Sequence, residues 1–383
     1  MTPAERYILL GLRLGRHVDG LVDSYYGPAA LKDQVDAEDL VPADRIAADA
    51  DELRDELEES WLRDLVHGVA TYAHVLAGEP IAYSDEVEAC YGVRPQRLDE
   101  SVYAQAHARL DELLPPGGTL GERREAWREQ HRMPADKLLP VLNEILAELR
   151  ARTAATFGLA EGEGMDVEEV RDEPWWAFNY YQGDLRSRVV VNVDVPTTYD
   201  DLLELAAHEG YPGHHTERST KELTLVRERG ALEETINMVP TPQSLLAEGI
   251  AETAPLILGE EARQAVLAIL ARHGLRFDAD RARQIREALK PIRGIGLDTA
   301  LLIHEDGATL DDAIEFVMRW GATTEERARQ QVRFVTDPTW RAYVITYSAG
   351  GRIVGAYHRG EPERFARLLR ENVRVPDLIA GGS

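Results

Sequence analysis

Apolar residues recur at intervals of three to four positions along most of the first half of the chain. Such a repeat places the apolar side chains on one face and predicts amphipathic helices. The pattern covers residues 4–23, 43–78, 100–114 and 137–157. It predicts an all-helical N-terminal lobe over residues 1–157 and a second lobe over residues 158–383. The two lobes are expected to form one continuous globular unit.

A different pattern occupies the segment that follows. Trp175 to Tyr181 and Ser187 to Val193 are rich in aromatic and β-branched residues, with Gln182-Gly183-Asp184 between them. These features predict two strands joined by a tight turn. We expect this hairpin to lie beside the helix described next, where its main chain could pair with an extended ligand.

Three histidines and a glutamate then fall within eight residues, His208-Glu209-Gly210-Tyr211-Pro212-Gly213-His214-His215, directly after an apolar helical stretch. Neutral imidazoles are good zinc ligands, and a neighbouring glutamate that does not bind the ion can take a proton from the attacking water. The octet therefore predicts a hydrolytic zinc site.

The spacing of the histidines is unusual, because Pro212 stands four residues after His208. Proline has no N–H for the helical bond, so the helix must kink, bulge or break there. A bulge of two residues would return His214 to the side of His208. In a straight helix His215 would lie about 10.5 Å along the axis, too far for one ion. We expect His214 as the second ligand, with His215 as the alternative.

A catalytic zinc site needs a third protein ligand. Glu248 and Glu252 lie one turn apart in an Ala/Leu-rich helical stretch, and carboxylates in so apolar a setting need a partner. We expect Glu248 as the third ligand and Glu252 as the group that holds an imidazole N–H. The expected cofactor is one Zn²⁺ per chain, although the same ligands could hold Co²⁺, Mn²⁺ or Fe²⁺.

Together, the octet and the later Ala247-Glu248-Gly249-Ile250-Ala251 segment resemble the family catalogued as domain of unknown function 885. Its members carry a His-Glu-x-x-Pro-Gly-His-His segment followed by a Glu-Gly-x-Ala segment. Further similarity lies in Val189–Asn192, Gly296–His304 and Tyr347–Gly350, so the resemblance covers about residues 170 to 360.

The resemblance implies a zinc metallopeptidase with a mostly α, two-lobed fold and a small β-hairpin or sheet beside the active-site helix. In such an enzyme Glu209 would act as the general base. A second donor should stabilise the developing oxyanion, and Tyr347 and His304 are the candidates. Tyr347 is favoured because its Tyr-x-x-Gly context resembles the family more closely.

Composition limits the partners. A net charge of −25 argues against nucleic acid and disfavours anionic membranes, since both need clustered Lys and Arg. The single cysteine, Cys90, cannot form an internal disulfide, and the first residues lack the layout of a secretory signal. These features predict a cytoplasmic protein. The octet and the resemblance imply a peptide or small amide substrate as its partner.

Two other functions remain open from the residues alone. The same machinery could hydrolyse a non-peptide amide or small metabolite, because specificity depends on the pocket. A non-catalytic zinc-binding protein is the third possibility, against which Glu209 argues. Arg293 and Arg352 could clamp a substrate carboxylate, but both stay outside the predicted site.

Overall fold

The structure is a computed structural model that describes residues 1–173 and 175–382. In chain order its first elements are α1 (Pro3–Gly15), β1 (Val22–Tyr25), α2 (Ala29–Ala37), α3 (Ala43–Glu56), α4 (Trp61–Leu76), α5 (Tyr83–Tyr91), α6 (Glu100–Leu113), α7 (Leu120–Gln130), α8 (Ala135–Phe157), β2 (Gly164–Val170), β3 (Ala177–Gly183) and β4 (Arg186–Asn192). They are followed by α9 (Asp201–Glu209), α10 (His214–Lys221), β5 (Ile236–Met238), α11 (Pro242–Arg272), α12 (Ala279–Leu289), α13 (Ile295–His304), α14 (Leu310–Trp320), α15 (Glu325–Thr336), α16 (Gly351–His358), α17 (Pro362–Arg370) and α18 (Val375–Gly382). The predicted mostly α fold is confirmed.

The predicted hairpin is also present. Strand β3 pairs antiparallel with β4, and β2 pairs parallel on the other side of β4, so β3 is an edge strand of the sheet. The turn falls at Asp184 and Leu185, both with positive φ, one residue later than the sequence predicted. Strand β2 was not predicted, because its run of Asp166, Glu168 and Glu169 carries little apolar patterning.

The N-terminal region is not all helical, which corrects the expectation for residues 1–157. Helix α1 ends at Gly15, and Val22–Tyr25 form β1, which pairs antiparallel with β5. Gly20 adopts a φ of 78°, a left-handed conformation that glycine tolerates and that a continuing helix excludes. Pairing with a strand from the distant residues 236–238 then decides the conformation of residues 22–25.

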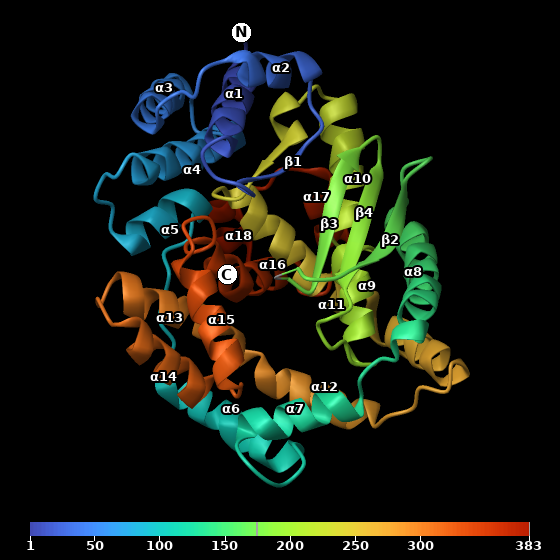
Figure 1. Cartoon of the computed structure of the whole chain (residues 1–383). Coiled ribbons are helices and arrows are strands. Elements are labelled where there is room, and N and C mark those ends of the chain that lie inside the picture. Colours follow the sequence, from blue (N-terminus) through green and yellow to red (C-terminus); the bar gives the residue numbers. More distant parts are fainter. Residues whose placement is uncertain (174, 383) are drawn as a thin grey trace.

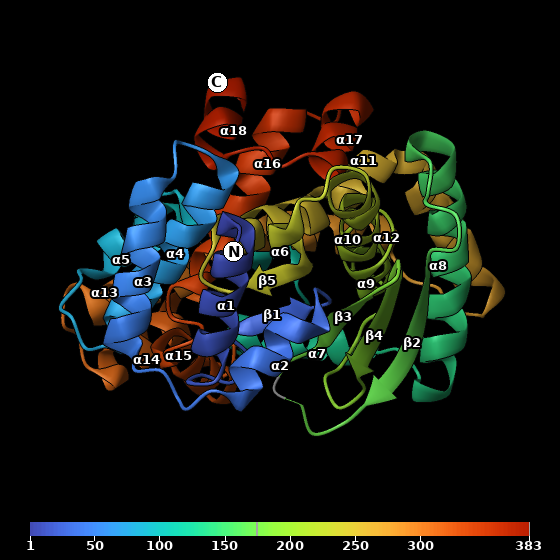
Figure 2. The ribbon, with the colours of Figure 1, turned by 90° about the horizontal axis from the view of Figure 1, so that it is seen from above.

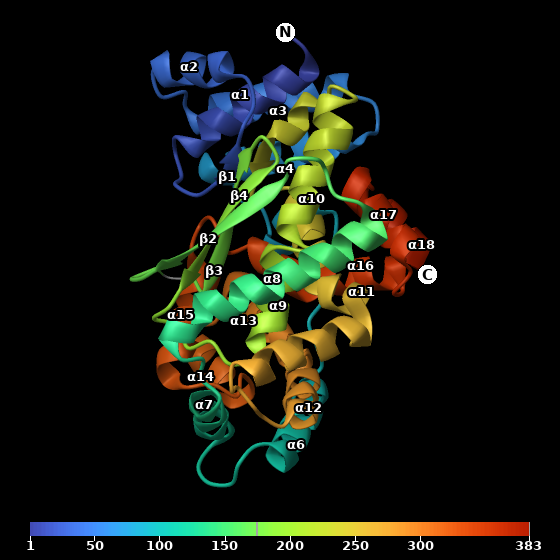
Figure 3. The same cartoon turned by 90° about the vertical axis from the view of Figure 1, so that its right-hand side faces the viewer.

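Helices surround the sheet on the side of the metal-ligand motif. Figures 1 and 2 show α9 and α10 beside β3 and β4, with α8 along β2 and α11 packed against α9. Helices α1–α3 lie at one end of the molecule, and α6, α7 and α12 lie at the other (Figure 3). Helices α9 and α11, which carry candidate ligands, contact each other. They lie between these two ends of the molecule (Figure 3).

The hydrophobic core is continuous across the boundary expected at residue 157. Its largest cluster joins Tyr7 and Tyr91 from the first part of the chain to Leu245 and Tyr357 from the second. A second cluster links α8, α9 and α11 through side chains such as Leu142, Leu205 and Ile269. Among the described helices, none has the length and apolar character required to cross a bilayer.

Candidate metal centre

The helix that carries the motif breaks where Pro212 predicted it would. Helix α9 ends at Glu209 and α10 begins at His214. A Cβ atom on Gly213 would lie 2.0 Å from the carbonyl oxygen of His208, so the chain can pass this closely only with glycine there. The Gly213 N–H donates to the carbonyl of Ala207 at 2.9 Å, which fixes the break.

This break brings His214 back beside His208, as the expected bulge would have done. The two imidazole rings have centroids 4.7 Å apart and are almost perpendicular, at 88°. Helix α11 contributes Glu248, whose Oε2 lies 3.6 Å from Nε2 of His208 and whose Oε1 lies 3.6 Å from Nε2 of His214. The three potential ligand atoms lie within 4.8 Å of one another.

These distances suit a single metal ion. Ligand atoms bound tetrahedrally to zinc at about 2.0–2.1 Å lie about 3.3 Å apart, close to the 3.6 Å separations observed. Glu248 Oε2 is buried and accepts no hydrogen bond from the described residues. Because a buried carboxylate oxygen without a partner is costly, a cation at this point would stabilise it. The donor set of two imidazoles and one carboxylate therefore fits a zinc ion.

The electrostatics of the cluster also favour a cation. Burial lowers the pKa of His208 well below its ordinary value, with contributions from His214 and Arg293, and burial with nearby Arg218 lowers the pKa of His214 to about 3. Both imidazoles are therefore neutral and have lone pairs to offer. Burial raises the pKa of Glu248 to about 7 despite the hydrogen bond from Tyr343, so a nearby positive charge would favour its ionised form.

Glu209 lies next to this cluster, at the wall of the same cavity. The cavity has a volume of about 990 Å³, and His208, Glu209, His214 and Glu248 all line it. Burial, followed by the charges of Glu248 and Asp23, raises the pKa of Glu209 to about 8. The His208 side chain is 30% exposed, so a ligand in the cavity can reach the cluster.

Two tyrosines approach Glu248 from the chain near residue 345. Tyr343 donates its hydroxyl hydrogen bond to Glu248 Oε1 at 2.7 Å, and the ring of Tyr347 lies against that of Tyr343 with centroids 5.4 Å apart. Loss of hydration at its hydroxyl, followed by the charge of Glu248, raises the pKa of Tyr347, which therefore keeps its proton. Tyr347 lines the cavity, as a predicted oxyanion donor should.

Two glycines explain why α11 and the Tyr347 segment come so close. A Cβ on Gly249 would lie 2.6 Å from the carbonyl oxygen of Gly350, and a Cβ on Gly350 would lie 2.8 Å from that of Leu245. The glycines that follow Glu248 and Tyr347 in the sequence therefore allow the backbones to touch. Close contact of these segments is what places Tyr343 and Tyr347 beside the cluster.

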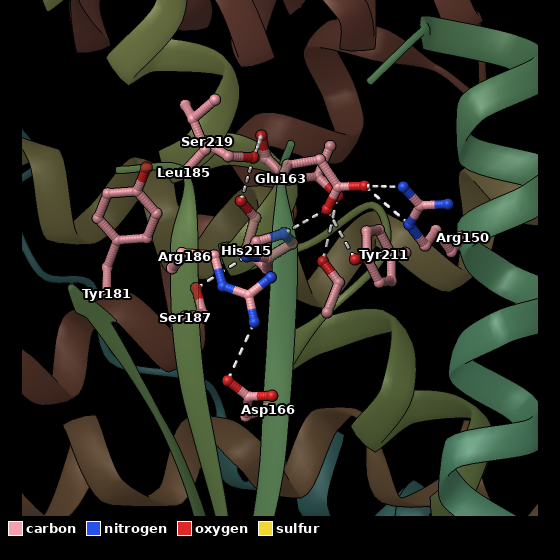
Figure 4. Close-up of polar contacts among 12 residues, drawn as sticks. Arg150, Glu163, Asp166, Tyr181, Leu185, Arg186, Ser187, Tyr211, His215 and Ser219 are labelled. Atoms are coloured by element: carbon pink, nitrogen blue, oxygen red, sulfur yellow. Dashed lines mark hydrogen bonds and ion pairs between the residues drawn. The ribbon is translucent and has the colours of Figure 1, made fainter. Parts of the chain in front are cut away.

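The other histidine of the motif, His215, belongs to a separate buried network (Figure 4). Its Nε2 donates to Glu163 Oε2 at 2.7 Å, and its Nδ1 lies 2.8 Å from the hydroxyl of Ser187. Glu163 also accepts from Tyr211 and pairs with Arg150. Burial alone would raise the pKa of Glu163, but the hydrogen bonds from His215 and Tyr211 lower it. His215 therefore joins α10 to the sheet and lies outside the cluster, so the alternative second ligand is set aside.

Two further expectations are corrected. Glu252 pairs with Arg293 rather than with an imidazole, because the side chain one turn beyond Glu248 points to the neighbouring helix. His304 lies away from the cavity: its Nε2 bonds the carbonyl of Val335 at 2.8 Å, and its ring stacks on Tyr83. These contacts make His304 part of the packing between α5, α13 and α15.

Sequence reasoning missed Tyr343 and Asn179. The side-chain amide of Asn179, on the edge strand β3, donates to the main-chain carbonyl of Glu209 at 2.6 Å and so holds the end of α9. Tyr343 precedes Tyr347 by four residues, a helical spacing that could have marked it as a second tyrosine on the same face. No local signal identifies Asn179.

Comparison with known proteins informs the fold alone. No family model matches the chain, and no curated protein matches it. Among solved structures it is similar to the "putative lipoprotein" of Colwellia psychrerythraea, with a TM-score of 0.53 and 15% identity over 89% of this chain and 67% of that one. It also matches a "putative lipoprotein of unknown function" from Shewanella oneidensis, with a TM-score of 0.48 and 12% identity over 96% and 69% of the two chains.

Proposed function

We propose that this chain is a zinc-dependent hydrolase and that its reaction is the cleavage of peptide bonds. The observation that carries the proposal is the convergence of His208, His214 and Glu248, with ligand atoms within 4.8 Å, on the wall of a cavity that Glu209 also lines. A structural zinc site usually closes with four Cys or His ligands and has no use for a neighbouring base. The resemblance to the domain of unknown function 885 family supports the same assignment.

Each residue has a distinct task in this proposal. His208, His214 and Glu248 would hold the ion, which supplies Lewis acidity toward water and a carbonyl group. Glu209 takes a proton from the attacking water and later returns it to the leaving amine. Tyr347 keeps its hydroxyl proton and donates a hydrogen bond to the developing oxyanion.

The edge strand of the sheet offers a place for an extended substrate. Ala177, Phe178 and Tyr180 of β3 line the same cavity as the ligand cluster, and β3 has one unpaired edge within the described sheet. A peptide that adds to such an edge gains main-chain hydrogen bonds irrespective of its sequence. This observation favours a peptide over a small metabolite as substrate.

The first test is metal content combined with cleavage of a mixed peptide library. Purified wild-type protein is expected to carry one zinc per chain and to cleave peptides, and a chelator should abolish the cleavage until zinc is restored. His208→Ala should contain no zinc. Zinc without peptide cleavage would favour the alternative of a non-peptide amide substrate, and cleavage that persists without metal would refute the proposal.

A cytoplasmic location is a separate proposal that rests on the single cysteine, which cannot form an internal disulfide. A protein of similar fold is described as a "putative lipoprotein", so attachment to a membrane is the alternative to test. Fractionation of cells that express the chain, with detection in the cytosolic or the membrane fraction, separates the two locations.

A further inference from the structure

Arg218 occupies an unusual position one turn beyond His214. The two residues are four apart on α10, a spacing that puts their Cβ atoms about 6 Å apart on one helix face. Both line the cavity of the ligand cluster. The Arg218 side chain is only 12% exposed, so its charge lies in a region with little water.

The N–H groups of the Arg218 guanidinium have no acceptor among the described residues. Its nearest acidic group is Asp23 on β1, with Oδ2 3.7 Å from Nη2, which is beyond hydrogen-bond distance. That oxygen already accepts from the side-chain amide of Asn237 at 2.6 Å. The structure records no hydrogen bond from the Arg218 side chain to any described residue. Because Arg218 lines the cavity, its N–H groups are open to a ligand there, and an anion that accepts them would bind with little competition from water.

We propose that Arg218 binds the free C-terminal carboxylate of the substrate, which makes the substrate class short peptides or acylated amino acids with an unblocked carboxyl group. This inference rests on the proposed hydrolase function, because it defines what that site cuts. The planar guanidinium matches a carboxylate with two parallel hydrogen bonds. Because each residue of chain spans at most about 3.6 Å, a carboxylate held one helical turn from a metal ligand places the cleaved bond near the end of the peptide.

The aromatic walls of the cavity suit the side chain of such a terminal residue. The cavity lining includes Trp175, Phe178 and Tyr180 from β3 and the residues before it, and Phe334 and Trp340 from the segment around the end of α15. Phe334 and Trp340 stack nearly parallel, with ring centroids 5.9 Å apart. An apolar or aromatic terminal residue would bury its side chain against these rings.

Other arginines are less suited to this role. Arg293 pairs with Glu252, and both Arg293 and Arg352 line a different cavity of about 930 Å³. Of the described residues, Tyr347 alone lines both cavities. Arg327 also lines the ligand-cluster cavity, but it pairs with Glu125. Arg333 also lines the ligand-cluster cavity, but its side chain is exposed, so an ion pair there would be screened by water.

The test compares two matched probes, acetyl-phenylalanine and acetyl-phenylalanine amide, which differ only in the terminal carboxylate. Binding is measured by calorimetry to the zinc-loaded Glu209→Gln protein, in which turnover is suppressed. The acid should bind about 10- to 100-fold more tightly than the amide, and Arg218→Gln should remove that preference while it leaves amide affinity within about threefold. Arg218→Lys, which keeps the charge without the fork, should retain a smaller preference.

Arg333→Gln is the matched comparison, since it removes the exposed cation of the same cavity. Preference for the acid that survives Arg218→Gln, or that disappears in Arg333→Gln instead, would overturn the proposal. Circular dichroism and thermal melts check that each variant folds. If Arg218→Gln does not fold, the acid preference of Arg218→Lys is the deciding measurement. Cleavage of peptides that end in a free acid and of the matching amides is measured in a separate assay, which distinguishes failure of the carboxylate site from failure of the hydrolase proposal. Peptide cleavage without an acid preference refutes the carboxylate site alone, whereas Arg218-dependent binding without any cleavage refutes the hydrolase alone.

Discussion

The hydroxyl of Tyr343 donates a 2.7 Å hydrogen bond to Oε1 of Glu248, the oxygen that lies 3.6 Å from His214. The two residues are 95 positions apart in the sequence. Burial, followed by the charge of Glu248, raises the pKa of Tyr343 well above its ordinary value, so the hydroxyl remains a donor. Tyr343 therefore fixes the orientation of the one carboxylate in the ligand cluster and leaves Oε2 for the ion.

Tyr343→Phe should weaken zinc binding without loss of the fold. Groups that orient a metal ligand typically contribute 10- to 100-fold to metal affinity, and we expect a loss of about tenfold here. Competition with a chromophoric chelator measures the affinity. Tyr347→Phe is the control for the loss of a neighbouring hydroxyl, because Tyr347 has no hydrogen bond to Glu248 in the described structure, and its zinc affinity should match that of wild type.

His214→Ala and His215→Ala should have opposite effects. His214→Ala should lose zinc and keep most of the stability of the metal-free protein. His215→Ala should lower the free energy of unfolding by about 2–4 kcal/mol, because Glu163 and Ser187 lose their buried partner. Zinc per folded chain should stay near one in His215→Ala. Elemental analysis measures the zinc content, and urea denaturation measures the free energy of unfolding. Zinc loss confined to His215→Ala would show that the ligands are misassigned.

Glu209→Gln should separate catalysis from metal binding. The amide keeps the size of the side chain but cannot accept a proton, so kcat should fall by about 10²- to 10⁴-fold. Zinc content should be unchanged, since Glu209 is not part of the ligand triad. Steady-state kinetics on the best library peptide provide the measurement, and activity within about threefold of wild type would exclude Glu209 as the base.

His358, which is not among the residues that line the cavity, should make the fold sensitive to acid. Its side chain is fully buried, Nδ1 accepts from the Gly360 N–H at 2.9 Å, and Nε2 has no partner among the described residues. Burial lowers its pKa from 6.5 to about 4. Between these values the unfolded chain binds a proton that the folded chain does not, so the free energy of unfolding falls as the pH drops from about 6.5 to about 4.

The variant His358→Asn removes this titration and keeps an acceptor for Gly360. Urea denaturation at pH 7 and pH 4.5 should show that the variant loses about 1–3 kcal/mol less stability than wild type over that interval. An equal loss in the two proteins would mean that His358 is not the group responsible. Because the other titrating groups are common to both proteins, their contributions cancel in the comparison.

Part of the candidate site could be predicted from local sequence. Pro212 removes a helical N–H, so the break after Glu209 follows from the residue itself. Other parts could not. The helical pattern of residues 4–23 includes Val22 and Asp23, yet residues 22–25 form a strand because β5 supplies a partner from more than 200 positions away. His304 carries the right chemistry for catalysis, but its neighbours Tyr83 and Val335 hold it elsewhere.

The sequence by itself determined the mostly helical class, the hairpin before the motif, and the presence of imidazole and carboxylate chemistry around a broken helix. These follow from side-chain periodicity and from the backbone limits of proline and glycine, which act over a few residues. Only the tertiary structure decided that His214 rather than His215 meets His208, that Tyr343 holds Glu248, and that Arg218 enters the same cavity. Those relationships depend on contacts between distant segments, such as the approach of Gly249 to Gly350, whose partners no local pattern identifies.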